Sequence, residues 1–317
     1  MVRNRIAHPR GQAVAARQEG VAVLVAMVVV AIAALAASSF MFRSQVEWRR
    51  MENLTRGAEA HWVLRAAQQW GASVLLDDAL HSSVDYLGEL WATRLPPVEA
   101  EGYRVSGWME DEEGRFNLNN LVLNGKANNQ QLAIFMRLLR ILHLPENLAF
   151  ALADWIDADD VPLNPDSAES AYYASLPSPY RAANQPLINM NELLRVKGFD
   201  SNVLSALRPY VTALPTRTPI NVNTASPEVL AALVDGLSTQ EAYTMVAKRE
   251  RIYYRNSQDF QQALPTGLTA PADMVSVSSQ YFLVQVRVRN ERLAIGNQAL
   301  YHRDGPTLPK LVWRAEL

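Results

Sequence analysis

The sequence has no cysteine in its 317 residues, and it has no large excess of charge of either sign. Without cysteine, disulfide frameworks, thiolate zinc sites and cysteine nucleophiles are all excluded. The 30 Lys and Arg residues nearly balance the 32 Asp and Glu residues, for a formal net charge of -2. A dedicated nucleic-acid-binding protein needs a basic surplus to displace counterions. We therefore expect no nucleic-acid partner.

Patterns typical of catalytic sites are also missing. The chain has 14 glycines, with no phosphate-cradling glycine loop and no G-x-S-x-G elbow. Its 5 histidines are scattered and form no H-E-x-x-H pair. Asp154 and Asp157 have the i, i+3 spacing of a carboxylate dyad, but no groove or aromatic subsite accompanies them. We expect that the protein is not an enzyme.

One long apolar run is present, from Val21 to Phe42, and it carries no charge. A helix of this length spans a hydrocarbon core of about 30 Å. A secretory signal peptide has a shorter apolar stretch, of about 7–15 residues, and is cut after it. A buried core helix is rarely apolar on every side with basic flanks. The run therefore predicts a transmembrane segment at 21–42, although four arginines on each side leave its orientation undecided by charge.

The span is expected to continue as an amphipathic helix. Apolar residues follow one another in steps of three and four from Met51 to Val74, which is the period of a helix. Joined to the span, this segment predicts one helix of roughly 55–60 residues that ends near Leu80.

The remaining pattern predicts one antiparallel sheet interrupted by helices. Residues 103–109 alternate as a strand, 111–114 form a turn and 115–118 return as a hairpin. Further strand-like runs appear only at 281–288, 293–301 and 311–315. Residues 119–274 read as short helices and turns. Two segments there, beginning at Ile188 and Ile220, resemble helix-hairpin-helix units, which can bind DNA or simply pack together.

Residues 154–169 concentrate carboxylates in a loop. Calcium takes 6–8 oxygen ligands and would hold such a group together, whereas the alternative is a solvated acidic loop at a helix end. The loop is not an EF-hand, because Pro162 stands where that motif needs glycine. The predicted ligands are Asp157, Asp159 and Glu169, followed by Asp160 and Asp166.

Several motifs together resemble a known family. The basic leader ends in Arg17-Gln-Glu-Gly20, directly before the apolar run. Further on come Arg115-Phe-Asn-Leu-Asn-Asn120, the acidic loop with Pro179-Tyr180-Arg-x-x-Asn184, and Ile220-Asn-Val-Asn-Thr224. The chain is thus similar to the K-type minor pseudopilins of type II secretion systems, in the type IV pilin-like superfamily. It departs from their pattern at Ser167, where the family tends to have glycine.

This resemblance implies a processing site and an orientation. A prepilin peptidase would cut after Gly20 and methylate Val21, which leaves the N-terminus cytoplasmic and the C-terminal domain periplasmic on the inner membrane. Most pilins carry Glu at the fifth mature position, where this chain has Val25. A carboxylate in the bilayer is costly unless paired, and a subunit at the filament tip has no neighbouring amine in front of it. The missing Glu is therefore typical of the tip subunit.

The resemblance also implies the fold and the partners. The expected fold class is α+β, a pilin-like fold with a long N-terminal transmembrane helix packed on an antiparallel sheet that is interrupted by a large all-α insertion. The expected parts are a leader at 1–20, the span at 21–42, a pilin-like domain at 43–118 and 275–317, and the insertion at 119–274. The expected partners are the I-type, J-type and H-type minor pseudopilins, the major pseudopilin, the prepilin peptidase, the inner-membrane platform and the secretin. Some family members bind calcium in the acidic loop. The alternative function is a membrane-anchored DNA-binding protein of a DNA-uptake or type IV pilus machine.

Overall fold

The structure is a computed structural model that describes residues 15–94 and 96–317, with side chains from residue 21 onward. Most of the predicted leader, residues 1–14, lies outside the described residues. The chain divides into two compact units, Met1–Ala60 and His61–Leu317, and the boundary falls within the first helix.

Helix α1 (Ala15–His81) contains all the described residues of the first unit. It is 67 residues long and begins before the predicted span, because the helix continues through residues 15–20. Its most apolar window of 18 residues has a mean hydropathy of 2.8, and none of that window is buried. Among the described residues, α1 is the one helix long and apolar enough to cross a membrane.

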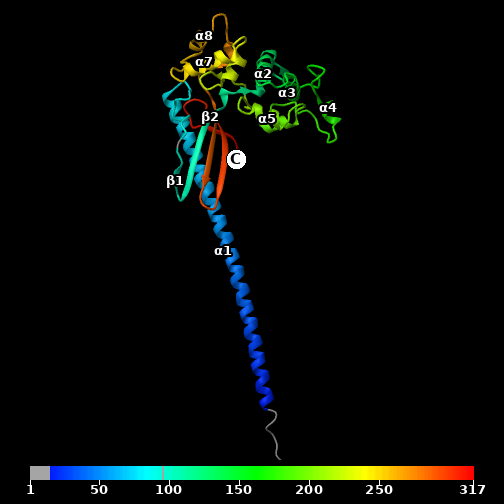
Figure 1. Cartoon of the computed structure of the whole chain (residues 1–317), viewed down its shortest axis with the longest axis vertical. Coiled ribbons are helices and arrows are strands. Elements are labelled where there is room, and N and C mark those ends of the chain that lie inside the picture. Colours follow the sequence, from blue (N-terminus) through cyan, green and yellow to red (C-terminus); the bar gives the residue numbers. More distant parts are fainter. Residues whose placement is uncertain (1–14, 95) are drawn as a thin grey trace, which may run out of the picture. The chain divides into compact units, whose positions relative to one another are not determined.

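The second unit contains an antiparallel five-stranded sheet in the order β1-β2-β9-β10-β11. Its strands are β1 (Val98–Ala100), β2 (Tyr103–Asp111), β9 (Tyr281–Arg289), β10 (Ala294–His302) and β11 (Lys310–Glu316). The sheet therefore joins residues 98–111 to residues 281–316, as Figure 1 shows by the contrast of teal and orange strands. The predicted C-terminal strands are all present, whereas β1 was not predicted.

The C-terminal part of α1 packs on the middle of this sheet. A Cβ on Gly71 would lie 3.1 Å from Cγ1 of Val284 in β9, so the absence of a side chain lets helix and strand approach closely. Gln68 Nε2 donates to Asn297 Oδ1 of β10 at 3.0 Å. Leu64 and Leu75 are buried on the same side of the helix. The predicted fold class is confirmed in this arrangement of an apolar N-terminal helix, an antiparallel sheet and additional helices.

The α-helices after α1 all lie between β2 and β9 in the sequence. They are α2 (Asn129–Ile141), α3 (Leu148–Ile156), α4 (Ser170–Ala174), α5 (Ser201–Leu207), α6 (Pro227–Leu233), α7 (Thr239–Arg249) and α8 (Ser257–Ala263). The same stretch of sequence contains the short 3-10 helices η1 (Glu112–Gly114), η2 (Leu118–Leu121), η3 (Met190–Arg195) and η4 (Ala272–Met274). The helices enclose a continuous apolar core in which Phe116 stacks on Phe135 with ring centroids 5.6 Å apart. The exact limits of the inserted domain remain a prediction.

The hairpin predicted between residues 103–109 and 115–118 is wrong. Asp111 Oδ1 accepts a hydrogen bond from the amide of Glu113 and starts η1, so the chain turns away from β2. Strand β3 (Phe116–Asn117) then pairs in parallel with β6 (Val211–Thr212). Burial of Phe116 in the helical core outweighs the local alternation that favoured a return strand.

Two further short pairs lie in the helical segment. Strand β4 (Val122–Leu123) pairs with β5 (Lys126–Ala127), and β7 (Ile220–Asn221) runs parallel to β8 (Val275–Ser276).

Both predicted hairpin units form helix pairs, η3 with α5 and α6 with α7. Gly198 and Gly236 hold positive φ angles of 85° and 81° at their turns. Ser226 caps α6, since its Oγ accepts from the amide of Val229 at 3.3 Å. The hairpin unit that begins at Ile188 starts with a 3-10 helix, so it is less regular than the hairpin unit that begins at Ile220.

Candidate functional site

The acidic loop lies between α3 and α4, which bring three carboxylates to one point. Asp154 occupies the last turn of α3, Asp157 is its C-cap residue and Glu169 immediately precedes α4. One carboxylate oxygen from each of the three lies within 4.8 Å of the other two. All three side chains are buried, with 0%, 2% and 3% exposed.

Several polar atoms at this point have no hydrogen-bond partner among the described residues. At the cluster they are Asp157 Oδ1 and both carboxylate oxygens of Glu169, while Asn184 Oδ1 and Trp155 Nε1 in neighbouring segments also lack a partner. A buried acceptor without a partner costs about 1–3 kcal/mol, and more if it is charged. A cation shared by the three carboxylates would give these unpartnered acceptors a partner and would remove that cost.

The pKa shifts of the three carboxyl groups also favour a bound cation. Burial, with the charges of Asp159 and Asp154 next in size, raises the pKa of Asp157 to about 7. Burial, followed by the charges of Asp154 and Asp157, raises the pKa of Glu169 to about 8. Asp154 is shifted upward too, chiefly by burial, against a hydrogen bond that it accepts from the amide of Leu163 at 3.1 Å. A divalent cation would reverse these shifts by balancing the mutual repulsion.

These donors fit calcium. They are all carboxylate oxygens, and no histidine is among them. Hard oxygen donors in a flexible loop are the ligands that calcium prefers, whereas zinc favours nitrogen and sulfur. Asn184 is held in place because its main-chain N–H donates to the Trp155 carbonyl at 3.0 Å.

The structure separates the five predicted ligands into two groups. Asp157 and Glu169 lie at the carboxylate cluster, whereas the side chains of Asp159, Asp160 and Asp166 are exposed. Asp159 Oδ1 accepts from the amide of Val161 at 2.9 Å, which makes it part of the turn. Asp159 and Asp160 lie near enough to raise the pKa values of the buried pair.

Sequence reasoning did not name Asp154 and Asn184 as ligands. Asp154 lies on a helix, one turn before Asp157, and that spacing was the available signal. Asn184 lies 15 residues after Glu169 in the sequence, and its Nδ2 donates to the carbonyl of Asp159 at 3.3 Å, which holds it beside the loop. Asn184 stands in a motif that the chain shares with the family, but its residue type does not predict this contact.

Aromatic rings and one lysine contact the loop and its flanking helices. Trp155 packs edge-on against Tyr173 at 5.0 Å between centroids, and Tyr173 stacks on Tyr180 at 5.2 Å. Lys197 Nζ donates to the carbonyl of Asp166 at 2.8 Å and lies 4.8 Å from the centroid of Tyr172. The loop is thereby fixed to the first hairpin unit.

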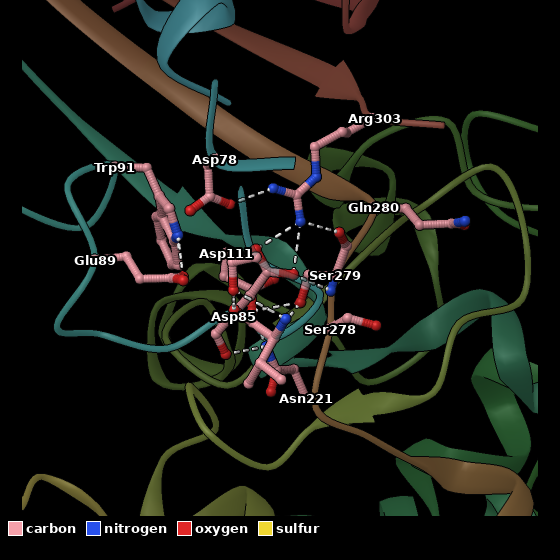
Figure 2. A network of polar contacts seen from close by, with 12 residues as sticks. Asp78, Asp85, Glu89, Trp91, Asp111, Asn221, Ser278, Ser279, Gln280 and Arg303 are labelled. Carbon is pink, nitrogen blue, oxygen red and sulfur yellow. Dashed lines mark hydrogen bonds and ion pairs between the residues drawn. The ribbon is translucent and has the colours of Figure 1, made fainter. Parts of the chain in front are cut away.

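A second acidic group, which sequence reasoning missed, is organised by an arginine (Figure 2). Arg303, just after β10, donates to Asp78 Oδ2 at 2.6 Å and to both oxygens of Asp85 at 2.5 and 2.6 Å. Burial lowers the pKa of Arg303, but the carboxylates of Asp85 and Asp78 more than reverse this and leave it raised. Glu89 Oε2 accepts from Trp91 Nε1 at 2.7 Å. These carboxylates already have donors, so we interpret the group as structural.

Asp111 extends this network into the helical segment. Its Oδ2 accepts from Asn221 Nδ2 at 3.0 Å, from Thr224 Oγ1 at 2.5 Å and from Ser279 Oγ at 2.6 Å. Figure 2 shows Asp111, Asn221 and Ser279 meeting below Arg303. The end of α1, the end of β2 and the strand β7 are thus joined through one buried polar cluster.

The predicted processing site lies in the first unit. Gly20 is part of the continuous helix α1. Val21 and Val25 follow in the same helix and are both exposed, as expected for side chains that would face lipid or partner helices. Cleavage and methylation at this position stay predictions.

Family models match the chain in two adjacent segments. Both are described as "Type II secretion system (T2SS), protein K", one at residues 114–216 and the other at residues 220–278. The first segment contains the acidic loop and the second contains the pair α6 and α7. Similar proteins extend the match further: "Type II secretion system protein K" of Pseudomonas aeruginosa is 32% identical over 303 residues, 91% of this chain and 90% of the relative. This chain belongs to the type II secretion system protein K family.

Other relatives agree with this assignment. Protein K of Aeromonas hydrophila is 31% identical over 84% of this chain and 87% of the relative. The fold is similar to a chain in the crystal structure of the GspK-GspI-GspJ complex of enterotoxigenic Escherichia coli, with a TM-score of 0.69. That match covers 84% of this chain and 99% of the other at 21% identity, so it bears on the fold alone.

The contacts of two charged residues indicate the role of the hairpin units. Lys197, the residue of the first unit best suited to a phosphate, instead donates to two loop carbonyls. Asp235 is exposed at the second hairpin, with Arg137 as its ion-pair partner at 3.7 Å. The geometry favours a packing role for these units over contact with a DNA backbone.

Proposed function

We propose that this protein is the minor pseudopilin that caps the tip of a type II secretion pseudopilus and nucleates its assembly. The observation that carries the proposal is the match to protein K along nine tenths of the chain. A long apolar helix ahead of a pilin-like sheet supports it, since such a helix can anchor a subunit before assembly and pack against other helices afterwards. The proposed role is non-enzymatic export of proteins across the outer membrane.

Val25 supports the position at the tip. An ionised Glu at the fifth mature position would need a cation within the bilayer, because a charge there costs several kcal/mol or more. Val25 avoids that cost in a subunit with no neighbour in front of it. The bulk of the helical segment would then block further subunits from stacking above it.

We further propose that processing follows the prepilin pathway. A prepilin peptidase cuts after Gly20 and methylates Val21, and the helix stays in the inner membrane with its C-terminal domain in the periplasm. Mass spectrometry of the protein purified from membranes tests this. A methylated Val21 at the N-terminus is expected in the wild type, with uncut protein in Gly20→Glu. An intact leader in the wild type would overturn it.

Calcium is the proposed structural ion of the acidic loop. Asp154, Asp157 and Glu169 would hold it, with Asn184 Oδ1 as a further donor, and the unpartnered buried oxygens are what supports this. The ion would supply charge balance and fix the loop, without taking part in catalysis.

The partners of a tip subunit would be the I-type and J-type minor pseudopilins, in line with the complex named for the structural neighbour. The full chain, co-expressed with candidate I-type and J-type proteins and extracted in mild detergent, tests this. A stoichiometric complex is expected on size-exclusion chromatography. A monodisperse monomer in every combination would reject the tip-complex role.

A further inference from the structure

Glu169 is the member of the carboxylate cluster that α3 does not carry. The other two belong to the end of that helix, whereas Glu169 lies at the far end of the loop, immediately before α4. The turn before it closes on itself, because Asn164 Oδ1 accepts from the amides of Asp166 and Ser167 at 2.7 and 2.9 Å. These bonds shape the turn but do not join it to another segment. The position of Glu169 therefore depends on contacts from outside the turn.

Lys197 supplies such contacts on both sides of Glu169. Its Nζ donates to two main-chain carbonyls of the turn before Glu169, at 2.8 and 3.3 Å. After Glu169, the ammonium lies 4.8 Å from the ring centroid of Tyr172, and the main-chain N–H of Lys197 donates to the hydroxyl oxygen of Tyr173 at 3.2 Å. An ammonium offers three donors and is attracted to an aromatic face, so one lysine can satisfy all of these partners.

Lys197 is itself fixed to α3, the helix that carries the other two carboxylates. The next residue, Gly198, has a φ of 85°, and a Cβ there would lie 2.7 Å from Cδ2 of Leu148 in α3. The chain can approach the helix this closely because the residue is glycine. The residues that flank this pair are buried in the same apolar core as α3. Lys197 therefore relates the position of Glu169 to that of the carboxylates on α3.

These contacts do not make Lys197 the counter-ion of the cluster. Its ammonium donates to carbonyls and lies on an aromatic ring, and among the described residues it forms no ion pair with a carboxylate. The unpartnered oxygens of Asp157 and Glu169 receive no hydrogen bond from it. A positive charge near a cation site also repels the cation. Any gain in affinity from Lys197 must come from the position of the loop and not from its charge.

We propose that Lys197 is a positioning residue of the cation site, which holds the segment around Glu169 in the ion-binding arrangement before the ion arrives. The inference rests on the calcium site proposed above and names the residue that prepares it. A site that is only fractionally in its binding arrangement has an apparent affinity reduced by that fraction. Lys197 raises the fraction. Because such coupling is reciprocal, the bound ion in turn fixes the first hairpin unit through Lys197.

Calcium titration of the full-length protein in detergent, followed by calorimetry after removal of ions with chelator, tests this role. Lys197→Met keeps an apolar stem against Tyr172 but removes the ammonium donors. Loss of two hydrogen bonds from a charged group predicts calcium binding about tenfold weaker than in the wild type, or weaker still. Lys197→Arg keeps the charge and the donors and should bind nearly as the wild type does. Lys248→Met is the matched control, because it removes the same charge from an exposed residue of α7 in the second hairpin unit.

A second measurement separates positioning from simple stabilisation of the fold. In chelator, the amides of residues 163–169 should exchange hydrogen faster in Lys197→Met than in the wild type, and saturating calcium should restore their protection. A purely structural role predicts a different pattern. The melting temperature of Lys197→Met would then fall equally in calcium and in chelator, with the calcium affinity unchanged, and this result would overturn the inference.

The remaining outcomes separate the inference from the calcium site. If the wild type binds no calcium, the calcium site fails and the role of Lys197 with it. If the wild type binds calcium and Lys197→Met binds it as tightly or more tightly, the role of Lys197 alone is overturned, and tighter binding would identify the ammonium as a repelling charge. An equal loss of affinity in Lys248→Met would assign the effect to net charge and would also overturn the inference.

Discussion

The guanidinium of Arg303 donates to both carboxylate oxygens of Asp85, at 2.5 and 2.6 Å, although 218 residues separate the two in sequence. Both side chains are buried. This pair fixes the segment after α1 to the end of β10, and it links the sheet to the polar cluster around Asp111.

Removal of Arg303 should therefore be strongly destabilising. Arg303→Met retains most of the apolar volume over Phe282 but leaves Asp78 and Asp85 without their cation. The loss of one partner of a buried pair costs about 3–5 kcal/mol, because the other charge stays buried. Urea unfolding measures the change. Arg217→Met is the control, since its pair with Asp273 is partly exposed and should contribute about 1 kcal/mol or less. Equal stability of the two variants would contradict this prediction.

The stability of the protein should decline as pH rises through the neutral range. Burial, then the charge of Asp111, raises the pKa of Glu113 from 4.5 to about 8. The folded state thus binds the proton more tightly than the unfolded state. The stabilisation is complete below pH 4.5, decreases as the unfolded form ionises and is lost by about pH 8. In that window the slope is about 1.4 kcal/mol per pH unit for each such group.

Glu113→Gln tests the contribution of this group. The variant keeps an oxygen that can accept from the amides of Gln280 and Tyr281, as Glu113 Oε1 does. The free energy of unfolding, measured from pH 4.5 to 9, should fall less steeply than in the wild type. Glu241→Gln serves as the control, since hydrogen bonds from Ser238 lower the pKa of Glu241 and it stays ionised across this window. An unchanged slope in Glu113→Gln would show that this carboxyl titrates normally.

Calcium should stabilise the wild type and should stabilise Asp157→Asn much less. Asp157→Asn removes a charge from the buried cluster, so it should melt at or above the wild-type temperature in chelator. The wild type should gain about 2.7 kcal/mol at a calcium concentration 100 times the dissociation constant, and Asp157→Asn should gain much less. Asp166→Asn, at an exposed residue of the same loop, should respond as the wild type does. Thermal unfolding with calcium and with chelator provides the readout. A wild-type midpoint that calcium does not change would exclude a structural ion.

Introducing a carboxylate at the fifth mature position should impair assembly. Val25→Glu places an acidic group in the uncharged run of α1, where a tip subunit offers it no amine. Co-purification of the full chain with partner pseudopilins should decrease, whereas Val25→Leu should behave as the wild type. If Val25→Glu assembles normally and supports secretion, the tip argument loses its basis.

Local pattern was enough for the long helix, the C-terminal strands and the helical segment. The uncharged run and the three-and-four spacing are properties of the chain itself, so α1 could be read directly from them. The same is true of β9, in which alternate residues face the helix. Only the start of α1 differed, because the helix extends back to Ala15.

Contacts between distant segments could not be read in this way. Phe116 alternates with its neighbours as a strand residue would, yet its partner is β6 and its ring packs on Phe135. Likewise, Asn184 reaches the acidic loop only through the path of the folded chain, where its Nδ2 donates to the carbonyl of Asp159. The density of acidic residues located the candidate site, but burial selected which of them meet, and burial is a property of the folded chain.

The polar cluster around Asp111 also limits how this architecture can be re-engineered. Because Asn221 and Thr224 donate to a carboxylate at the end of β2, excision of the helical segment would strip a buried acid of two donors. The helical segment is consequently not a removable cassette. A chimera that joins this segment to another pilin-like sheet would also have to include Asp111, Ser279 and Arg303.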